Sequence, residues 1–146
     1  MELRKYKDKF SEYTYYLKDG EEVRHGLCKR YYGNGKIRIE YNYKDGKIHG
    51  LFKYYYEDGE LKWEDNYKNG EFHGISKRYY RNGELEFEYN FKDGVSHGIS
   101  KRYYLNGELE FENNWKNGVS HGLCKYYYEN GKLKCEYNWE NGILII

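Results

Sequence analysis

The sequence predicts an all-β protein, an elongated single-layer antiparallel meander of repeated β-hairpins. Three observations support this fold class. Every histidine is followed by glycine, and neighbouring histidines are always 24 residues apart. Each interval holds two Asn-Gly or Asp-Gly turn signals, which favour hairpins between apolar-alternating runs. The runs between the turns alternate apolar and polar residues, with no competing 3.6-residue period.

The 24-residue period defines the expected domain organisation. Residues 1–24 break the period and are expected to supply a divergent capping strand, because only the segment 12–20 resembles part of a repeat. Residues 25–146 are expected to form five repeats with a short C-terminal tail. The repeats are 25–48, 49–72, 73–96, 97–120 and 121–144.

Each repeat is expected to contribute two strands around its first Asn-Gly or Asp-Gly. A two-residue turn there places a first-strand lysine opposite a second-strand glutamate in every repeat, and opposite charges across a ladder are favourable. The pairs are Lys29–Glu40, Lys53–Glu64, Lys77–Glu88, Lys101–Glu112 and Lys125–Glu136. A three-residue loop would move the lysines to the apolar face, so the two-residue turn is preferred. One face is then largely aromatic, and the other carries lysine, glutamate and asparagine.

Composition narrows the function classes. Aromatic residues make up 21% of the chain, which argues against disorder, and the formal charge of +1 predicts no nucleic-acid partner. Three cysteines without a CxxC pattern favour a reduced compartment. Nothing in the sequence approaches the roughly 20 apolar residues of a transmembrane segment. We expect a cytoplasmic protein, or an exported one if a signal peptide has been removed.

The His-Gly pairs are interpreted as structural turn residues between repeats rather than metal ligands. Equivalent histidines lie two strands apart, about 9.5 Å, whereas zinc binds its ligands at about 2.0 to 2.1 Å. We therefore expect neither a metal nor another cofactor. The residues are His25, Gly26, His49, Gly50, His73, Gly74, His97, Gly98, His121 and Gly122.

No catalytic motif or catalytic residue is identified, so the chain is not expected to be an enzyme. The aromatic face is the candidate binding surface, because soluble monomers seldom expose large apolar patches. Either the tyrosines and long basic side chains cover one another, or a partner covers them. The residues predicted to bind are Trp63, Tyr67, Phe87, Phe91, Phe111 and Trp115.

The repeated unit is G-x-x-x-x-Y-Y-x-N-G-x-L followed by E-Y-N-W/Y-x-N/D-G-x-x-H-G. This pattern resembles a MORN repeat, specifically the bacterial variant found in antitoxin-like proteins. The resemblance covers residues 25–142 and implies a twisted single-layer sheet of hairpins. It also implies neutralisation of a cognate toxin as one function. The eukaryotic form, for which lipid-headgroup binding is claimed, carries two further glycines, where this chain has Asn42 and Lys29.

The predicted function is a non-enzymatic repeat scaffold that binds a protein partner through the aromatic face or an open sheet edge. An antitoxin that neutralises a toxin is one alternative. Glycan or lipid-headgroup binding on the aromatic ladder is another, because regularly spaced rings suit stacking. A homodimer through the sheet face or a terminal edge is also open, since unpaired strand edges join readily to other chains.

Overall fold

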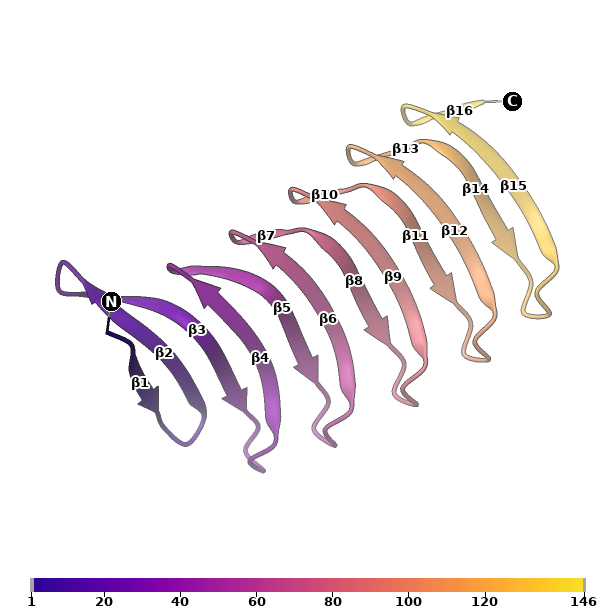
Figure 1. The fold of residues 1–146 in the computed structure, drawn as a ribbon. Helices are drawn as coiled ribbons and strands as arrows, with labels where there is room; N and C mark the ends of the chain where they lie inside the picture. Colours follow the sequence, from indigo (N-terminus) through magenta and orange to yellow (C-terminus); the bar gives the residue numbers. More distant parts are fainter. Residues whose placement is uncertain (1, 146) are drawn as a thin grey trace. The chain divides into compact units, whose positions relative to one another are not determined.

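The computed structural model describes residues 2–145, whose regular secondary structure is entirely β-strand (Figure 1). The chain divides into two compact units, Met1–Glu71 and Phe72–Ile146. The strands up to the division are β1 (Arg4–Lys7), β2 (Ser11–Lys18), β3 (Glu21–Tyr31), β4 (Ile37–Lys44), β5 (Lys47–Tyr55) and β6 (Leu61–Lys68), followed by β7 (Glu71–Phe72). The others are β8 (Gly74–Tyr79), β9 (Leu85–Lys92), β10 (Val95–Ser96), β11 (Gly98–Tyr103), β12 (Leu109–Lys116), β13 (Val119–Ser120), β14 (Gly122–Tyr127), β15 (Leu133–Glu140) and β16 (Ile143–Ile145).

Strands pair with their neighbours in the sequence, always antiparallel. In the first unit, β1 to β6 pair in chain order. In the second unit the order is β8-β9-β11-β12-β14-β15-β16, and the short strands β10 and β13 pair with β9 and β12. The predicted all-β meander of antiparallel hairpins is therefore confirmed.

The hairpin turn inside each repeat differs from the predicted two-residue turn. The Tyr32 N–H donates to the Lys36 carbonyl at 2.8 Å and the Gly35 N–H donates to the Tyr32 carbonyl at 3.0 Å, which leaves a three-residue loop. Gly35 has a φ of 82°, while Asn34 is not among the positive-φ residues. This is a type I turn followed by a glycine bulge.

The predicted lysine–glutamate register is nevertheless present in all five repeats. A register shift between Arg30 and Tyr31 absorbs the extra loop residue, so Lys29 lies opposite Glu40. The expectation that a three-residue loop would move the lysines to the other face is wrong, because a β-bulge can realign the strands.

The turn at the end of each repeat has a different geometry. Asp45 and Gly46 both have positive φ, 50° and 80°, as a type I′ turn requires. The Gly46 N–H donates to the carbonyl of Arg24 at 2.8 Å, and equivalent bonds recur in later repeats. A main-chain hydrogen bond thus joins each of these end turns to the strand that follows the preceding end turn.

The His-Gly pairs lie next to these end turns rather than within them. His25 and Gly26 are on β3 and His49 and Gly50 on β5, whereas the other three histidines lie between two strands and the glycine after each begins β8, β11 or β14. Between β4 and β5, Tyr41 pairs with Phe52 but Tyr43 pairs with Ile48, so β5 holds two extra residues around His49 and Gly50. Gly50 has a φ of 81°. Bulges of this kind bend a strand, and the long strands of each unit are visibly curved in Figure 1.

The segment 1–24 contains more structure than the single capping strand expected from the sequence. It forms β1, β2 and the beginning of β3. The Asp8 side chain accepts the backbone N–H groups of Phe10 at 2.8 Å and Ser11 at 2.6 Å, which closes a tight turn between β1 and β2. The turn at Asp8 reverses the chain, so that β1 can pair with β2. The 24-residue period does not indicate this strand, because the turn depends on local hydrogen bonds of Asp8.

The most buried side chains belong to the face that carries the aromatic residues. Tyr41 is 5% exposed, Asp65 4%, and the small residues Cys28, Ser76, Ser100 and Cys124 are each 2% exposed. These four small residues occupy one position, three residues after the histidine. Their size lets neighbouring rings and arginine side chains close over them. Burial raises the pKa of Tyr41, and a hydrogen bond with Cys28 adds to the effect.

Candidate interaction surface

The six aromatic residues predicted to bind a partner come from three equivalent strands. Trp63 and Tyr67 lie on β6 in the first unit, and the other four lie on β9 and β12 in the second unit. All six side chains are partly exposed, neither buried nor fully open to solvent. Trp63 and Tyr67 are on one face because they are four residues apart on a strand.

Rings in the first unit stack on their neighbours. Tyr54 lies parallel to Trp63, with ring centroids 4.1 Å apart and an interplanar angle of 12°. The Lys62 amine lies 5.2 Å from the Trp63 ring. Tyr67 contacts Phe52 at 6.0 Å. An aromatic neighbour therefore covers part of both Trp63 and Tyr67, and a cation covers a further part of Trp63.

Tyrosine hydroxyls near this stack form a short network. The Tyr32 hydroxyl donates to the Tyr55 carbonyl at 2.6 Å, and Arg38 Nε donates to the Tyr54 hydroxyl at 3.2 Å. Burial, with a hydrogen bond to Tyr54, raises the pKa of Tyr32 to about 12. The hydrogen bond from Arg38 lowers the pKa of Tyr54, because the guanidinium favours the phenolate.

In the second unit the predicted residues meet across strands. Phe87 lies 6.4 Å from Phe111, edge to face, and stacks on Tyr89 at 5.3 Å. The Arg102 guanidinium lies 4.9 Å from the Phe87 ring, and its Nε is 3.0 Å from a carboxylate oxygen of Glu110. The Arg102 side chain thus covers part of the Phe87 ring, while Phe87 and Phe111 both stay partly exposed.

Phe91 and Trp115 lie nearer the end turns. Phe91 contacts Phe72 at 5.1 Å and lines an open cavity of about 550 Å³ between His73 and Ile99. Trp115 lies opposite Gly98 on one side and Ser120 on the other. The structure therefore brings Phe87 and Phe111 together, while Phe91 and Trp115 have separate surroundings.

The opposite face carries aliphatic residues that the sequence reasoning missed. Each residue directly after a His-Gly pair is leucine or isoleucine, and four of the five are exposed. They are Leu27 at 40%, Ile75 at 40%, Ile99 at 42% and Leu123 at 38%. Asparagine side chains lie among them, and Asn90 Nδ2 donates to the Ile99 carbonyl at 2.5 Å. The sequence feature that could have predicted these aliphatic residues is the leucine or isoleucine that follows His-Gly in every repeat.

Four histidine side chains, those of His25, His49, His73 and His121, contact the end turn of the following hairpin. His25 Nδ1 lies 3.0 Å from Asp45 Oδ1, and His73 Nδ1 lies 3.2 Å from Asp93 Oδ1. His49 Nδ1 accepts the Asn69 N–H at 3.4 Å. Within residues 2–145, no group of three or more His, Cys, Asp or Glu side chains is arranged to hold a metal ion.

The stacked hairpins, bulged at His-Gly and joined by their end turns, define a repeat scaffold. A family model described as MORN repeat variant matches residues 24–45, 48–69, 72–93, 96–117 and 120–141. The chain therefore belongs to the MORN repeat variant family. No curated protein matches it. No helix in the described part of the chain is long and apolar enough to cross a membrane.

Several solved structures are distantly similar. One is S. aureus TarM in complex with Fondaparinux, alpha-GlcNAc-glycerol and UDP, at 9% identity and a TM-score of 0.43, covering 66% of this chain and 19% of that one. Another TarM crystal structure has 8% identity and a TM-score of 0.42, covering 71% and 20%. The GtfA/B complex bound to UDP and GlcNAc has 12% identity and a TM-score of 0.32, covering 75% and 22%. The chain spans about a fifth of each, and similarity at this level carries no functional assignment.

Proposed function

We propose that this chain is a non-enzymatic repeat scaffold that binds another protein through the aromatic face of its hairpins. The observation that carries the proposal is the set of partly exposed aromatic rings on one face of each unit, from β6 in the first unit and from β9 and β12 in the second. Rigid aromatic side chains dominate protein interfaces, because they supply large contact area at little cost in entropy.

Mutual stacking prepares these rings for binding. Tyr54 holds Trp63, and Arg102 with Tyr89 holds Phe87. A ring that is already fixed loses little conformational freedom when a partner covers it, so more of the contact energy appears as affinity. The aromatic face is consequently the first surface to test.

A second surface lies on the opposite face, where the row of leucine and isoleucine is exposed. Ile99 is 42% exposed and sits opposite Asn114. An aliphatic row bordered by lysine–glutamate pairs also suits a protein partner, since apolar centres with polar rims are typical of interfaces. Open strand edges offer a third route through strand addition.

The experiment compares three variants of the second unit in a quantitative pull-down from the native cell extract. Phe91→Ala removes an aromatic anchor, Ile99→Thr removes an aliphatic residue, and Glu88→Gln removes a charge while keeping the shape. Circular dichroism checks that each variant is folded. We expect loss of a specific partner with Phe91→Ala, by about 1 kcal/mol or more, and little change with Glu88→Gln.

Loss of the partner with Ile99→Thr alone would move the binding surface to the opposite face. Loss with Glu88→Gln alone would assign binding to the charged residues and reverse our proposal. A partner retained by all three variants would exclude both faces and leave the sheet edges. Sedimentation at several concentrations separates a second copy of the chain from a different partner.

Two narrower functions remain alternatives. An antitoxin role predicts that a toxin encoded next to this chain co-purifies with it and loses its toxicity. Glycan stacking predicts that sugars quench the fluorescence of Trp63, Trp115 or Trp139, as the periodic rings suggest. At Trp63 the stacked Tyr54 ring and Lys62 already occupy part of the indole surface, which favours a protein partner over a glycan there.

A further inference from the structure

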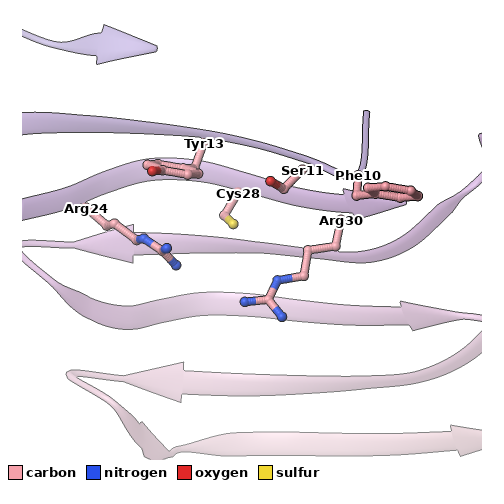
Figure 2. A pocket seen from close by; sticks show the side chains of 6 residues that line it. All are labelled: Phe10, Ser11, Tyr13, Arg24, Cys28 and Arg30. Carbon is pink, nitrogen blue, oxygen red and sulfur yellow. The ribbon is translucent and has the colours of Figure 1, made fainter. Parts of the chain in front are cut away.

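A cavity of about 250 Å³ lies in the first unit, where the repeats begin (Figure 2). Its wall comes from β2, β3 and the turn before β2. The lining residues are Phe10, Ser11, Tyr13, Arg24, Cys28 and Arg30. Two of these side chains are positively charged and none is acidic, so the cavity is suited to an anion.

The two arginines come from the same strand and flank one buried residue. Figure 2 shows Arg24 and Arg30 on either side of Cys28, with their guanidinium groups extending toward one another. Cys28 is 2% exposed and forms the floor. The Arg24 guanidinium lies 4.5 Å from the centre of the Tyr13 ring and 5.6 Å from that of Tyr43. A guanidinium stacked on a ring keeps its N–H groups directed outward in its own plane.

Nearby carboxylates have other partners. Glu40 pairs with Lys29 at 3.3 Å on the opposite face, and Glu12 pairs with Lys7 at 3.3 Å. Asp8 accepts two backbone N–H groups from the turn that follows it. None of the three lines the cavity.

The hydroxyl groups beside the arginines also form hydrogen bonds within the protein. The Ser11 hydroxyl donates to Asp8 at 3.1 Å, and the Tyr13 hydroxyl donates to Glu22 at 3.3 Å. Neither hydroxyl offers its proton to the cavity. The arginines are therefore the donors that would meet an anion there.

The repeat does not require this pair of arginines. Positions equivalent to Arg24 in later repeats are uncharged, namely Ile48, Phe72, Ser96 and Ser120. Arg78 and Arg102 are equivalent to Arg30, but Arg78 donates to the Lys77 carbonyl at 3.0 Å and Arg102 pairs with Glu110. Two arginines flanking a small buried residue therefore distinguish the start of the array.

We propose that this cavity binds a phosphate monoester carried on an aromatic ring. Two guanidinium groups match the charge of such a phosphate, about −1.5 to −2 at neutral pH, and each can bind its oxygens in a bidentate manner. Phe10, which is 54% exposed, provides a ring surface beside the arginines. The Tyr13 ring is already covered by the stacked Tyr6 ring at 4.9 Å and by the Arg24 guanidinium. The cavity is smaller than the roughly 300 to 1,000 Å³ of pockets for drug-sized ligands, which fits one ring with its phosphate. This inference is independent of the proposed protein partner.

Isothermal titration of the full chain with phenyl phosphate tests the proposal. We expect binding that weakens with salt, with benzoate and inorganic phosphate each weaker than phenyl phosphate. Arg30→Gln should weaken binding about tenfold or more, because a charge-assisted hydrogen-bonding pair is lost. Arg78→Gln, the same position two repeats later, is the matched control and should bind like the parent.

Three results would overturn the proposal. These are absence of phenyl phosphate binding by the parent, unchanged binding by Arg30→Gln, and equal weakening by Arg78→Gln. Arg24→Gln, checked for folding by circular dichroism, tests the second guanidinium and should give a loss similar to Arg30→Gln. N-acetyl-phosphotyrosine amide separates the two sources of the ligand. Binding as tight as phenyl phosphate assigns the site to a phosphorylated chain, and much weaker binding assigns it to a free aryl phosphate.

Discussion

Three glycines of the first unit separate the contributions of backbone conformation and side-chain crowding to stability. Gly26 and Gly50 have φ of 90° and 81° at His-Gly bulges, whereas Gly33 is not among the positive-φ glycines. A Cβ at Gly26 would lie 2.6 Å from Thr14 Oγ1, and a Cβ at Gly50 or Gly33 would meet nothing within 4 Å. Alanine at Gly33 therefore tests the restriction of the unfolded chain, alanine at Gly50 tests the positive φ, and alanine at Gly26 tests the positive φ together with crowding.

The expected order follows from these geometries. Gly33→Ala should be neutral or stabilising by up to about 1 kcal/mol, because alanine restricts the unfolded chain. Gly50→Ala should cost about 1 to 2 kcal/mol for placing a side chain at left-handed φ. Gly26→Ala should cost about 1 kcal/mol more, since the new methyl group displaces the Thr14 hydroxyl from its hydrogen bond with the His25 carbonyl.

Urea denaturation followed by circular dichroism measures these differences in the free energy of unfolding. For about 150 residues, 1 kcal/mol corresponds to roughly 2 to 4 °C in Tm, so Gly26→Ala should melt about 4 to 12 °C below the parent. Equal stability of Gly50→Ala and the parent would refute the role of positive φ at the bulge. A loss with Gly33→Ala as large as that with Gly50→Ala would refute the reasoning as a whole.

Three further predictions concern hydrogen bonds, pH and metals. Tyr104→Phe removes a hydroxyl that donates to the Tyr127 carbonyl at 2.8 Å and should lower the free energy of unfolding by about 0.5 to 1.5 kcal/mol; Tyr80→Phe, with the same bond to Tyr103, should match it. The pKa of Tyr32 rises from 10 to about 12 on folding. Its contribution to the free energy of unfolding is therefore complete below pH 10 and is lost as pH rises through about 12. The urea concentration at the unfolding midpoint should decrease as pH rises from 10 to about 12, and it should decrease less in Tyr32→Phe. Zinc and EDTA should leave Tm unchanged, and a shift of several degrees would contradict the structural interpretation of the histidines.

The sequence was sufficient for the features that depend on local pattern. The 24-residue period, the strand alternation and the facing of Lys29 and Glu40 follow from side-chain periodicity and from charge pairing across a ladder. The positions of the turns follow from the Asn-Gly and Asp-Gly dipeptides, although the turn type does not, since Asp45 has a positive φ and Asp58, also before a glycine, does not. All of these depend on residues that are close in the sequence or repeated within one hairpin.

Only the tertiary structure decided how neighbouring hairpins fit together. The two extra residues of β5 around Gly50 appear only in its pairing with β4 of the preceding repeat, so they do not follow from one hairpin alone. The exposure of Ile99 and the burial of Cys28 depend on which neighbouring side chains close over each face. The cavity beside Arg24, Cys28 and Arg30 likewise appears only once β2 and β3 are paired, because residues of both strands line it.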